Sequence, residues 1–151
     1  AAERLERAAG ERPEDAEAAL ARARALRSAL YRTFRAEIEG RAPLAEDVER
    51  LAGERRALSR GEALVEAGAG LRLEWRSEVS ALEALLWPPL RSAVALLTDP
   101  EALARVRRCA GEACGWLFYD TPRGLPRRWC YIRDCGNVAK VRAYRERERD
   151  G

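Results

Sequence analysis

The four cysteines are the residues of this sequence whose type and spacing could do chemistry. They form two pairs with four residues between partners, Cys109 with Cys114 and Cys130 with Cys135, and fifteen residues separate the pairs. Two close pairs of thiols joined by a short loop can bring four sulfur atoms around one tetrahedral metal ion. Because the sequence contains no histidine, the ligands would be four thiolates. This ligand set favours one structural Zn²⁺ with no open position for water or substrate.

The spacing leaves other states of the cysteines open. Two disulfides are one alternative, but the first twelve residues have no apolar centre that would mark a secretory signal. A rubredoxin-type iron centre has the same four ligands and is not distinguished by them. Free buried thiols are the third alternative. We expect a closed four-cysteine zinc site, and no zinc-dependent catalysis at it.

Turn residues and apolar patterns predict the elements that must position the cysteines. A strand over 116–119, a turn rich in Pro and Gly, and a return through 127–129 would form a hairpin between the two pairs. Asn137 follows the last ligand and is a favoured N-cap, so a helix is expected over 138–149. This order of elements, with a hairpin between the two ligand pairs and a helix after the second, is treble-clef-like. The aromatic core of so small a module would consist of Trp116, Phe118 and Trp129.

The apolar pattern of the first hundred residues predicts a helical domain. Apolar residues recur at three- and four-residue steps after Pro13, which indicates a long helix that Gly40 would end in a left-handed conformation. Pro88 and Pro89 must kink or divide a later helix, because each removes a backbone donor. The predicted elements are a helix from Pro13 to about Ile38, a second helix over 45–59 with apolar Val48, Leu51, Ala52 and Leu58, a β-hairpin over 61–75, and a helix over 77–97.

The expected fold class is therefore mainly α with a small β-hairpin, divided into a helical domain over 1–100 and a zinc finger over 101–151. The leucine and alanine stripes are read as an ordinary core, with a partner-binding face as the alternative. The sequence contains no Met, so we expect the helical domain to be truncated at its N-terminus. No apolar run is long enough to cross a membrane, and a cytoplasmic location is expected.

The basic residues are concentrated beside the cysteines. Residues 1–100 carry 16 basic and 18 acidic residues, for a net charge of −2, whereas residues 101–151 carry 12 and 7, for a net charge of +5. Only Lys140 is a lysine among the 28 basic residues, which indicates arginine-rich codon usage. The position of the arginines is therefore more informative than their number.

Three stretches resemble the CGNR-type zinc finger of bacterial proteins: Cys109-x4-Cys114-Gly-Trp-Leu-Phe-Tyr-Asp-Thr, Arg127-Arg128-Trp129-Cys130 and Cys135-Gly136-Asn137-x2-Lys140. In that family the finger follows a helical domain called ABATE, and the proteins are described as stress-induced transcription regulators. Residues 1–100 resemble the later part of that domain, less specifically. The arginine that ends the family's signature is Val138 here, so any contact made by that arginine would be lost or relocated.

Residues 105–149 hold 12 basic and 5 acidic residues, for a net charge of +7, which four thiolates and one Zn²⁺ reduce to +5. Such a surface favours phosphate contacts. Three alternatives stay open: the charges alternating after position 144 mark a solvated helix end, the 127–128 arginines pair with Asp120, or these two arginines donate to the thiolate sulfurs. The candidate nucleic-acid-binding residues are Arg123, Arg127, Arg128, Arg133, Lys140, Arg142 and Arg145.

We therefore predict a DNA-binding bacterial transcription regulator in which zinc holds the finger. The helical domain would sense a signal or form a homodimer. A rival from another class is a zinc-stabilised protein-interaction module. A third reading makes the helical domain a small-molecule receptor or an enzyme, but no constellation of titratable residues supports catalysis, and no catalytic residue is assigned.

Overall fold

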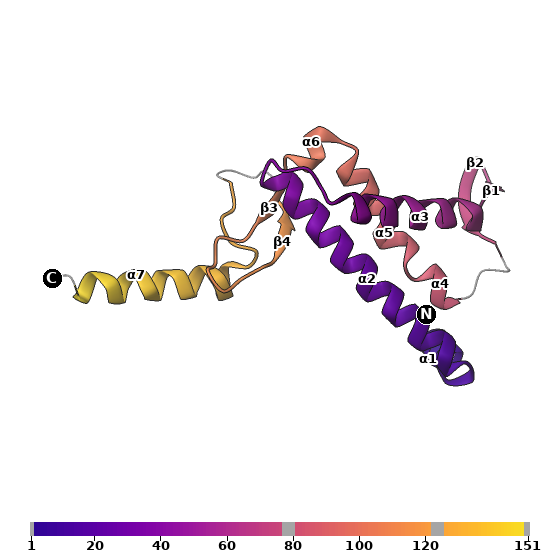
Figure 1. Cartoon of the computed structure of the whole chain (residues 1–151), viewed down its shortest axis with the longest axis horizontal. Helices are drawn as coiled ribbons and strands as arrows, with labels where there is room; N and C mark the ends of the chain where they lie inside the picture. Colours follow the sequence, from indigo (N-terminus) through magenta and orange to yellow (C-terminus); the bar gives the residue numbers. More distant parts are fainter. Residues whose placement is uncertain (1, 77–80, 122–125, 150–151) are drawn as a thin grey trace.

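α-Helices dominate the computed structural model, which describes residues 2–76, 81–121 and 126–149 (Figure 1). The helical part comprises α1 (Ala2–Glu11), α2 (Pro13–Ile38), α3 (Ala45–Gly61), β1 (Glu62–Ala67), β2 (Gly70–Trp75), α4 (Ala81–Ala84), α5 (Trp87–Leu97) and α6 (Pro100–Leu103). The C-terminal part comprises β3 (Val106–Arg108), β4 (Leu117–Tyr119), the π-helical turn η1 (Ile132–Gly136) and α7 (Asn137–Arg149). The predicted mainly helical class is confirmed, with two small antiparallel hairpins.

Helix α2 is the longest element, and both of its ends follow the sequence signals. Pro13 stands in the first turn, where its missing N–H removes no helical hydrogen bond. After Ile38, the Arg41 N–H donates to the Ala36 carbonyl at 2.8 Å and the Gly40 N–H donates to the Glu37 carbonyl at 3.1 Å. These two bonds form a Schellman cap, which requires the positive φ of +64° at Gly40. The predicted left-handed cap is confirmed.

The core of the helical part lies between α2, α3 and α5. Its fully enclosed centre is Leu58 on α3 and Leu90 on α5, packed against Leu26 and Ala29 of α2. Trp87, at the start of α5, extends the core to Trp75 at the end of the hairpin, with ring centroids 4.5 Å apart. This packing joins the hairpin to the helices.

Three details of the helical part differ from or refine the sequence prediction. Val48 is 49% exposed, because Asp47 and not Val48 faces α2 at that turn of α3. The expected helix over 77–97 is divided into α4 and α5, one of the two outcomes predicted from Pro88 and Pro89, and Pro88 stands in the first turn of α5. Residues 77–80, where that helix was expected to begin, lie outside the described residues.

An ion pair between the exposed Arg32 and the buried Asp47 joins α2 to the N-terminal turn of α3. The Arg32 guanidinium donates to both carboxylate oxygens of Asp47, at 2.8 and 2.6 Å, and Asp47 is only 1% exposed. These hydrogen bonds lower the pKa of Asp47, against the opposing effect of burial. The carboxylate also lies in the first turn of α3, where the helix dipole favours negative charge.

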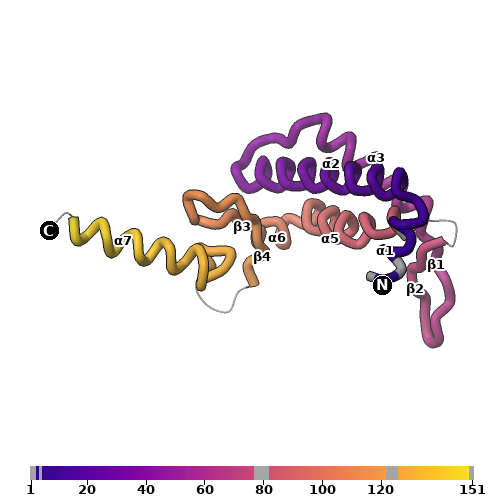
Figure 2. Tube along the Cα trace, turned by 90° about the horizontal axis from the view of Figure 1, so that it is seen from below, coloured from indigo at the N-terminus to yellow at the C-terminus, as the bar shows by residue number. Residues whose placement is uncertain are grey.

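The finger packs against the C-terminal half of α2 through β3, whereas α7 extends away from the rest of the molecule (Figures 1 and 2). At the tip of the first cysteine loop, a Cβ on Gly115 would lie 3.2 Å from the Tyr31 hydroxyl of α2. Among the described contacts between elements, α7 meets chiefly η1, the turn that precedes it. The finger is therefore held at its base and free along its last helix.

We expect Asp47→Asn to lower the free energy of unfolding by about 1–3 kcal/mol at pH 7, the range for losing a hydrogen bond to a charged group. Because the folded-state pKa is lowered, the ionic contribution is present above the unfolded pKa near 3.9 and is lost as the pH falls through the folded-state value. The free energies of unfolding of wild type and variant, measured with urea, should therefore differ less at pH 3 than at pH 7. Asp15→Asn, at an exposed acid, is the control; an equal effect of both variants would contradict the prediction.

Two glycines on α3 form a matched pair. A Cβ on Gly61 would lie 2.1 Å from Cη2 of Trp87, so Gly61→Ala must displace the indole and should destabilise the fold by about 1–3 kcal/mol. A Cβ on Gly53 meets only the Arg56 side chain, at 3.9 Å, so Gly53→Ala should stabilise by about 0.5–1 kcal/mol. Thermal unfolding followed by circular dichroism tests both. A stabilising Gly61→Ala would show that the indole is not fixed against this helix.

Candidate metal centre

The strands of the finger hold the first pair of cysteines between them. β3 and β4 pair antiparallel with the register Val106↔Tyr119, Arg107↔Phe118 and Arg108↔Leu117, so Cys109 and Cys114 lie in the loop that joins them. The Cys109 N–H donates to the Trp116 carbonyl at 2.9 Å and continues the ladder into this loop. The loop is thus a metal-binding knuckle at the end of a two-stranded hairpin.

The predicted partner of the 116–119 strand was wrong. Residues 127–129 are not a strand, and β4 pairs instead with β3, which precedes the first cysteine. The returning segment is attached by single bonds, from the Ala110 N–H to the Arg128 carbonyl at 2.9 Å and from the Arg127 N–H to Asp120 at 3.2 Å. The hairpin therefore surrounds the first ligand pair instead of separating the two pairs.

The second pair of cysteines is carried by the turn that leads into α7. Cys135 lies in η1, and the Gly136 N–H donates to the Tyr131 carbonyl at 3.4 Å. Asn137 has helical φ and ψ of −68° and −43°, whereas an N-cap residue has non-helical angles. The predicted N-cap at Asn137 was wrong, because the chain passes from the π-helical turn directly into α7.

The four sulfur atoms form one cluster. All lie within 4.8 Å of one another, and the Sγ atom of Cys130 is 3.8 Å from those of both Cys114 and Cys135. A tetrahedral Zn²⁺ with Zn–S bonds of about 2.3 Å has sulfur–sulfur edges of about 3.8 Å. Cys109 is buried and the other three cysteines are half-buried. The described residues therefore fit one structural zinc, as the spacing predicted.

Backbone donors and glycines adapt the chain to this cluster. The N–H groups of Gly111 and Cys130 point at the Sγ atom of Cys109, at 3.5 and 3.4 Å. A Cβ on Gly111 would lie 3.1 Å from Cβ of Cys114, and one on the buried Gly136 would lie 3.0 Å from Ile132. A larger residue at either glycine would press on a ligand loop.

The thiols differ in their tendency to ionise. Burial raises the pKa of Cys109, but the backbone donors of Cys130 and Gly111 outweigh it and bring the pKa down to about 7. Hydrogen bonds with the Cys109 and Cys114 sulfurs raise the pKa of Cys135 to about 12. In the absence of metal the cluster cannot hold four thiolates, because their mutual repulsion keeps protons bound. Zn²⁺ supplies the positive charge that releases these protons.

The aromatic residues of the finger do not form the expected common core. Trp116 is 72% exposed, so its assignment to the core was wrong. Phe118 and Trp129 are half-buried, and each is covered by a guanidinium, with Arg127 4.8 Å from the Phe118 centroid and Arg128 5.2 Å from the Trp129 centroid. The metal lies where a larger domain would place apolar side chains.

The buried Asp120 is bound by different groups from those expected. Its carboxylate pairs with the Arg107 guanidinium at 3.2 Å and accepts the backbone N–H of Arg127 at 3.2 Å. The Arg127 guanidinium donates instead to the Cys130 carbonyl at 2.6 Å. Of the alternatives left open for Arg127 and Arg128, a side-chain pairing with Asp120 is therefore not the one formed, and only the Arg127 backbone N–H reaches that carboxylate. Arg107 was overlooked because nothing in the sequence marks which of the two adjacent arginines before Cys109 turns inward.

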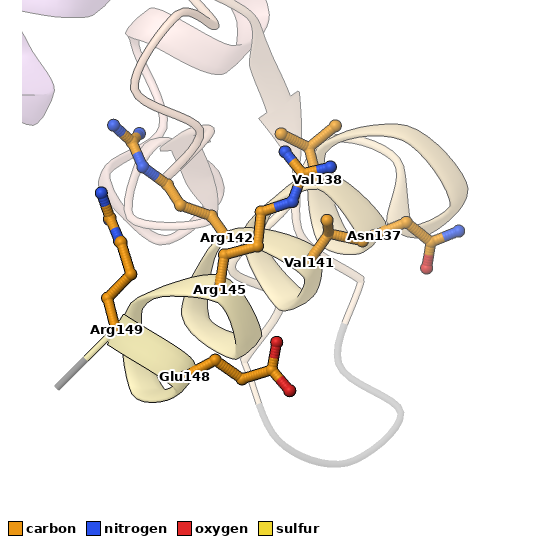
Figure 3. Close-up of a pocket in the computed structure, with 7 residues that line it drawn as sticks. All are labelled: Asn137, Val138, Val141, Arg142, Arg145, Glu148 and Arg149. Carbon is orange, nitrogen blue, oxygen red and sulfur yellow. The ribbon is translucent and has the colours of Figure 1, made fainter. Parts of the chain in front are cut away.

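The remaining candidate basic residues lie on η1 and α7, except Arg123, which lies outside the described residues. Arg142 pairs with Glu112 of the knuckle and with Glu146 at 3.5 Å. Within the described ranges, Arg133, Lys140 and Arg145 are exposed and make no ion pair. Figure 3 shows Arg142, Arg145 and Arg149 reaching to the same side of α7, with Val138 at its base.

The fold and the thiolate cluster define a zinc-finger protein with a helical N-terminal domain. Residues 1–100 match the ABATE family, described as "Putative stress-induced transcription regulator", and residues 105–148 match the CGNR zinc finger. The chain belongs to the ABATE family and carries a CGNR zinc finger. No curated protein sequence matches it. In the part of the chain that the structure describes, no helix is long and apolar enough to span a membrane.

Removal of zinc should unfold the finger and leave the helical part intact, since only the finger depends on the metal. The purified protein should contain one zinc per chain by elemental analysis. After chelation, hydrogen exchange should increase over 105–149, while the buried parts of α2, α3 and α5 stay protected. Zinc, but not magnesium, should restore protection, because thiolates select the softer ion. Unchanged exchange of the finger after complete zinc loss would contradict a structural role of the metal.

Proposed function

We propose that this protein is a DNA-binding transcription regulator and that its zinc finger supplies the DNA-contacting surface. The observation that carries the proposal is the arrangement of α7. This helix extends from the metal site, has no buried residue and presents basic side chains along its length (Figures 1 and 3). Membership of a family described as regulators agrees with this role.

The dimensions and charge of α7 suit a nucleic-acid groove. Thirteen helical residues span about 20 Å, and the major groove of B-DNA is about 12 Å wide and admits one α-helix. The finger with its zinc carries a formal charge of +5 over 105–149. Contacts to phosphates would release counterions, so the affinity should fall as the salt concentration rises.

Val138 occupies the place of the family's signature arginine. Its side chain is 68% exposed at the base of α7, beside Val141 and on the side to which Arg145 reaches (Figure 3). An exposed aliphatic side chain in a major groove contacts thymine methyl groups, whereas arginine pairs with guanine. In this proposal the first turn of α7 therefore reads a different base from that read by relatives with arginine.

The helical part takes a supporting role in this proposal. It has its own core and holds the finger at its base through β3, so it can sense a signal or dimerise without unfolding the metal site. We place the protein in the cytoplasm, where DNA is accessible and thiolates stay reduced. The closed ligand set of the metal supports a non-enzymatic role.

A protein-interaction module is the second candidate function. It is favoured by the exposed Trp116, which shares a groove beside the metal site with Trp129 and Val138. Exposed tryptophans of this kind form the centres of protein interfaces. In this alternative the finger would bind a partner protein through the knuckle, and the arginines of α7 would remain solvated.

The combined variant Lys140→Gln and Arg145→Gln tests the DNA proposal, because neither side chain makes an ion pair in the described part of the chain. A mobility-shift titration of zinc-loaded protein across salt concentrations should show weaker binding. The slope of log affinity against log salt should become shallower by about 0.9 for each lost phosphate contact. The matched control is Arg24→Gln with Arg56→Gln on α2 and α3, which changes the net charge equally. Trp116→Ala should leave the affinity unchanged.

Three results would favour the rival or reject the proposal. Zinc-loaded wild-type protein that fails to bind random duplex DNA at low salt rejects DNA binding. An equal loss of DNA affinity in the control variant would show that the effect depends only on the net charge of the protein. DNA affinity unchanged in the test variant, combined with loss of a partner protein in Trp116→Ala, supports the interaction module.

A further inference from the structure

A groove of about 700 Å³ lies where the helical part meets the finger. One wall comes from the C-terminal end of α2 and from α6, and the other from β3 and the segment that returns to Cys130. Figures 1 and 2 both place β3 beside α6 and the end of α2. The volume is in the range of small-molecule sites, and the position between two parts of a chain is a common one for them.

Four arginines line this groove: Arg107, Arg108, Arg127 and Arg128. They come from two segments that a backbone bond holds side by side, from the Ala110 N–H to the Arg128 carbonyl at 2.9 Å. The carboxylate of Asp120 binds the Arg107 guanidinium and the Arg127 backbone, and so connects the two segments. The arginines are therefore gathered by the fold and not by chance exposure.

The positive charge of the groove is not balanced by its lining. Glu37 is the acid that lines it, and Asp120 beneath offsets one further charge, which leaves a formal excess of two positive charges. Arg108 and Arg128 make no ion pair within the described residues. Like charges brought together in this way repel one another, and an anion bound between them would remove that cost.

The wall formed by α2 and α6 is apolar at Ile38, Leu103 and Pro100, of which Ile38 and Leu103 are half-buried. The buried Val106 of β3 adds a further apolar side chain to the lining. A phosphate chain of DNA would leave this wall unused, whereas a ligand with an apolar body and one anionic group would cover the wall and meet the arginines. Apolar walls with a few convergent charged groups are the usual composition of small-molecule sites.

We propose that this groove binds a small amphipathic anion, with a carboxylate, phosphate or sulfonate group at the arginines and an apolar body against Ile38 and Leu103. Arg108 and Arg128 hold the anionic group. The bound molecule contacts α2, α6 and β3 together and so ties the finger to the helical part. This site is distinct from α7, and the proposal does not depend on DNA binding.

The test uses the fluorescent probe 1-anilinonaphthalene-8-sulfonate with the zinc-loaded full chain. The probe should bind saturably, with one site per chain, and Arg108→Gln should weaken binding about tenfold, the usual effect of losing a charge-assisted hydrogen bond. Arg105→Gln is the matched control, since Arg105 is exposed three residues earlier and does not line the groove. Leu103→Gln should also weaken binding, through the apolar wall. Circular dichroism and zinc content must match wild type in each variant.

Competition identifies the ligand class. Hexanoate should displace the probe, whereas 1-hexanol, which lacks the charge, and inorganic phosphate, which lacks the apolar body, should not. Equal effects of Arg105→Gln and Arg108→Gln would overturn the assignment of the site. Displacement by inorganic phosphate as strongly as by hexanoate would overturn the amphipathic class. Displacement by a DNA duplex but not by hexanoate would make the groove part of a DNA surface and overturn the proposal.

Discussion

Four thiolates around one zinc ion are the constraint on which the C-terminal third of this molecule depends. Few of its described residues are buried: Val106, Cys109, Asp120 and Gly136. Complete burial of one aliphatic side chain contributes about 1.5–3 kcal/mol, whereas zinc binding in finger peptides contributes about 10–16 kcal/mol at neutral pH. A segment with so little core and a large positive charge therefore needs the metal to fold.

Because the metal stabilises the finger, its side chains are not needed for a core and can take other roles. Because zinc replaces a core, Trp116 can be exposed to solvent, and α7 can extend from η1 with that turn as its main contact among the described elements. The helical part is stabilised by burial instead, with Leu58 and Leu90 fully enclosed and the Asp47 carboxylate buried between α2 and α3. One chain thus combines a scaffold stabilised by apolar burial with a surface stabilised by coordination.

The sequence predicted those features that depend on local chemistry. Cysteine spacing located the metal site, and the apolar period and Gly40 located α2. The features it missed depend on distant partners. β3 has only three residues and no alternation, so its pairing with β4 is set by the knuckle that closes between them. Trp116 was assigned to a core because so small a module has little else to bury, yet the metal made that burial unnecessary.

Three arginines of the finger are already bound within its fold. Arg107 is neutralised by Asp120, Arg127 is bound to the Cys130 carbonyl and stacked on Phe118, and Arg142 is paired with Glu112. These three maintain the fold around the metal, although a simple count treats them as free. The charge available to a phosphate backbone is therefore carried by fewer residues. Among the described basic residues without an ion pair, Arg133, Lys140 and Arg145 lie on η1 and α7, whereas Arg108 and Arg128 line the groove beside α2. In the DNA complex that we propose, the last helix meets the phosphates and the groove stays available to the small anion.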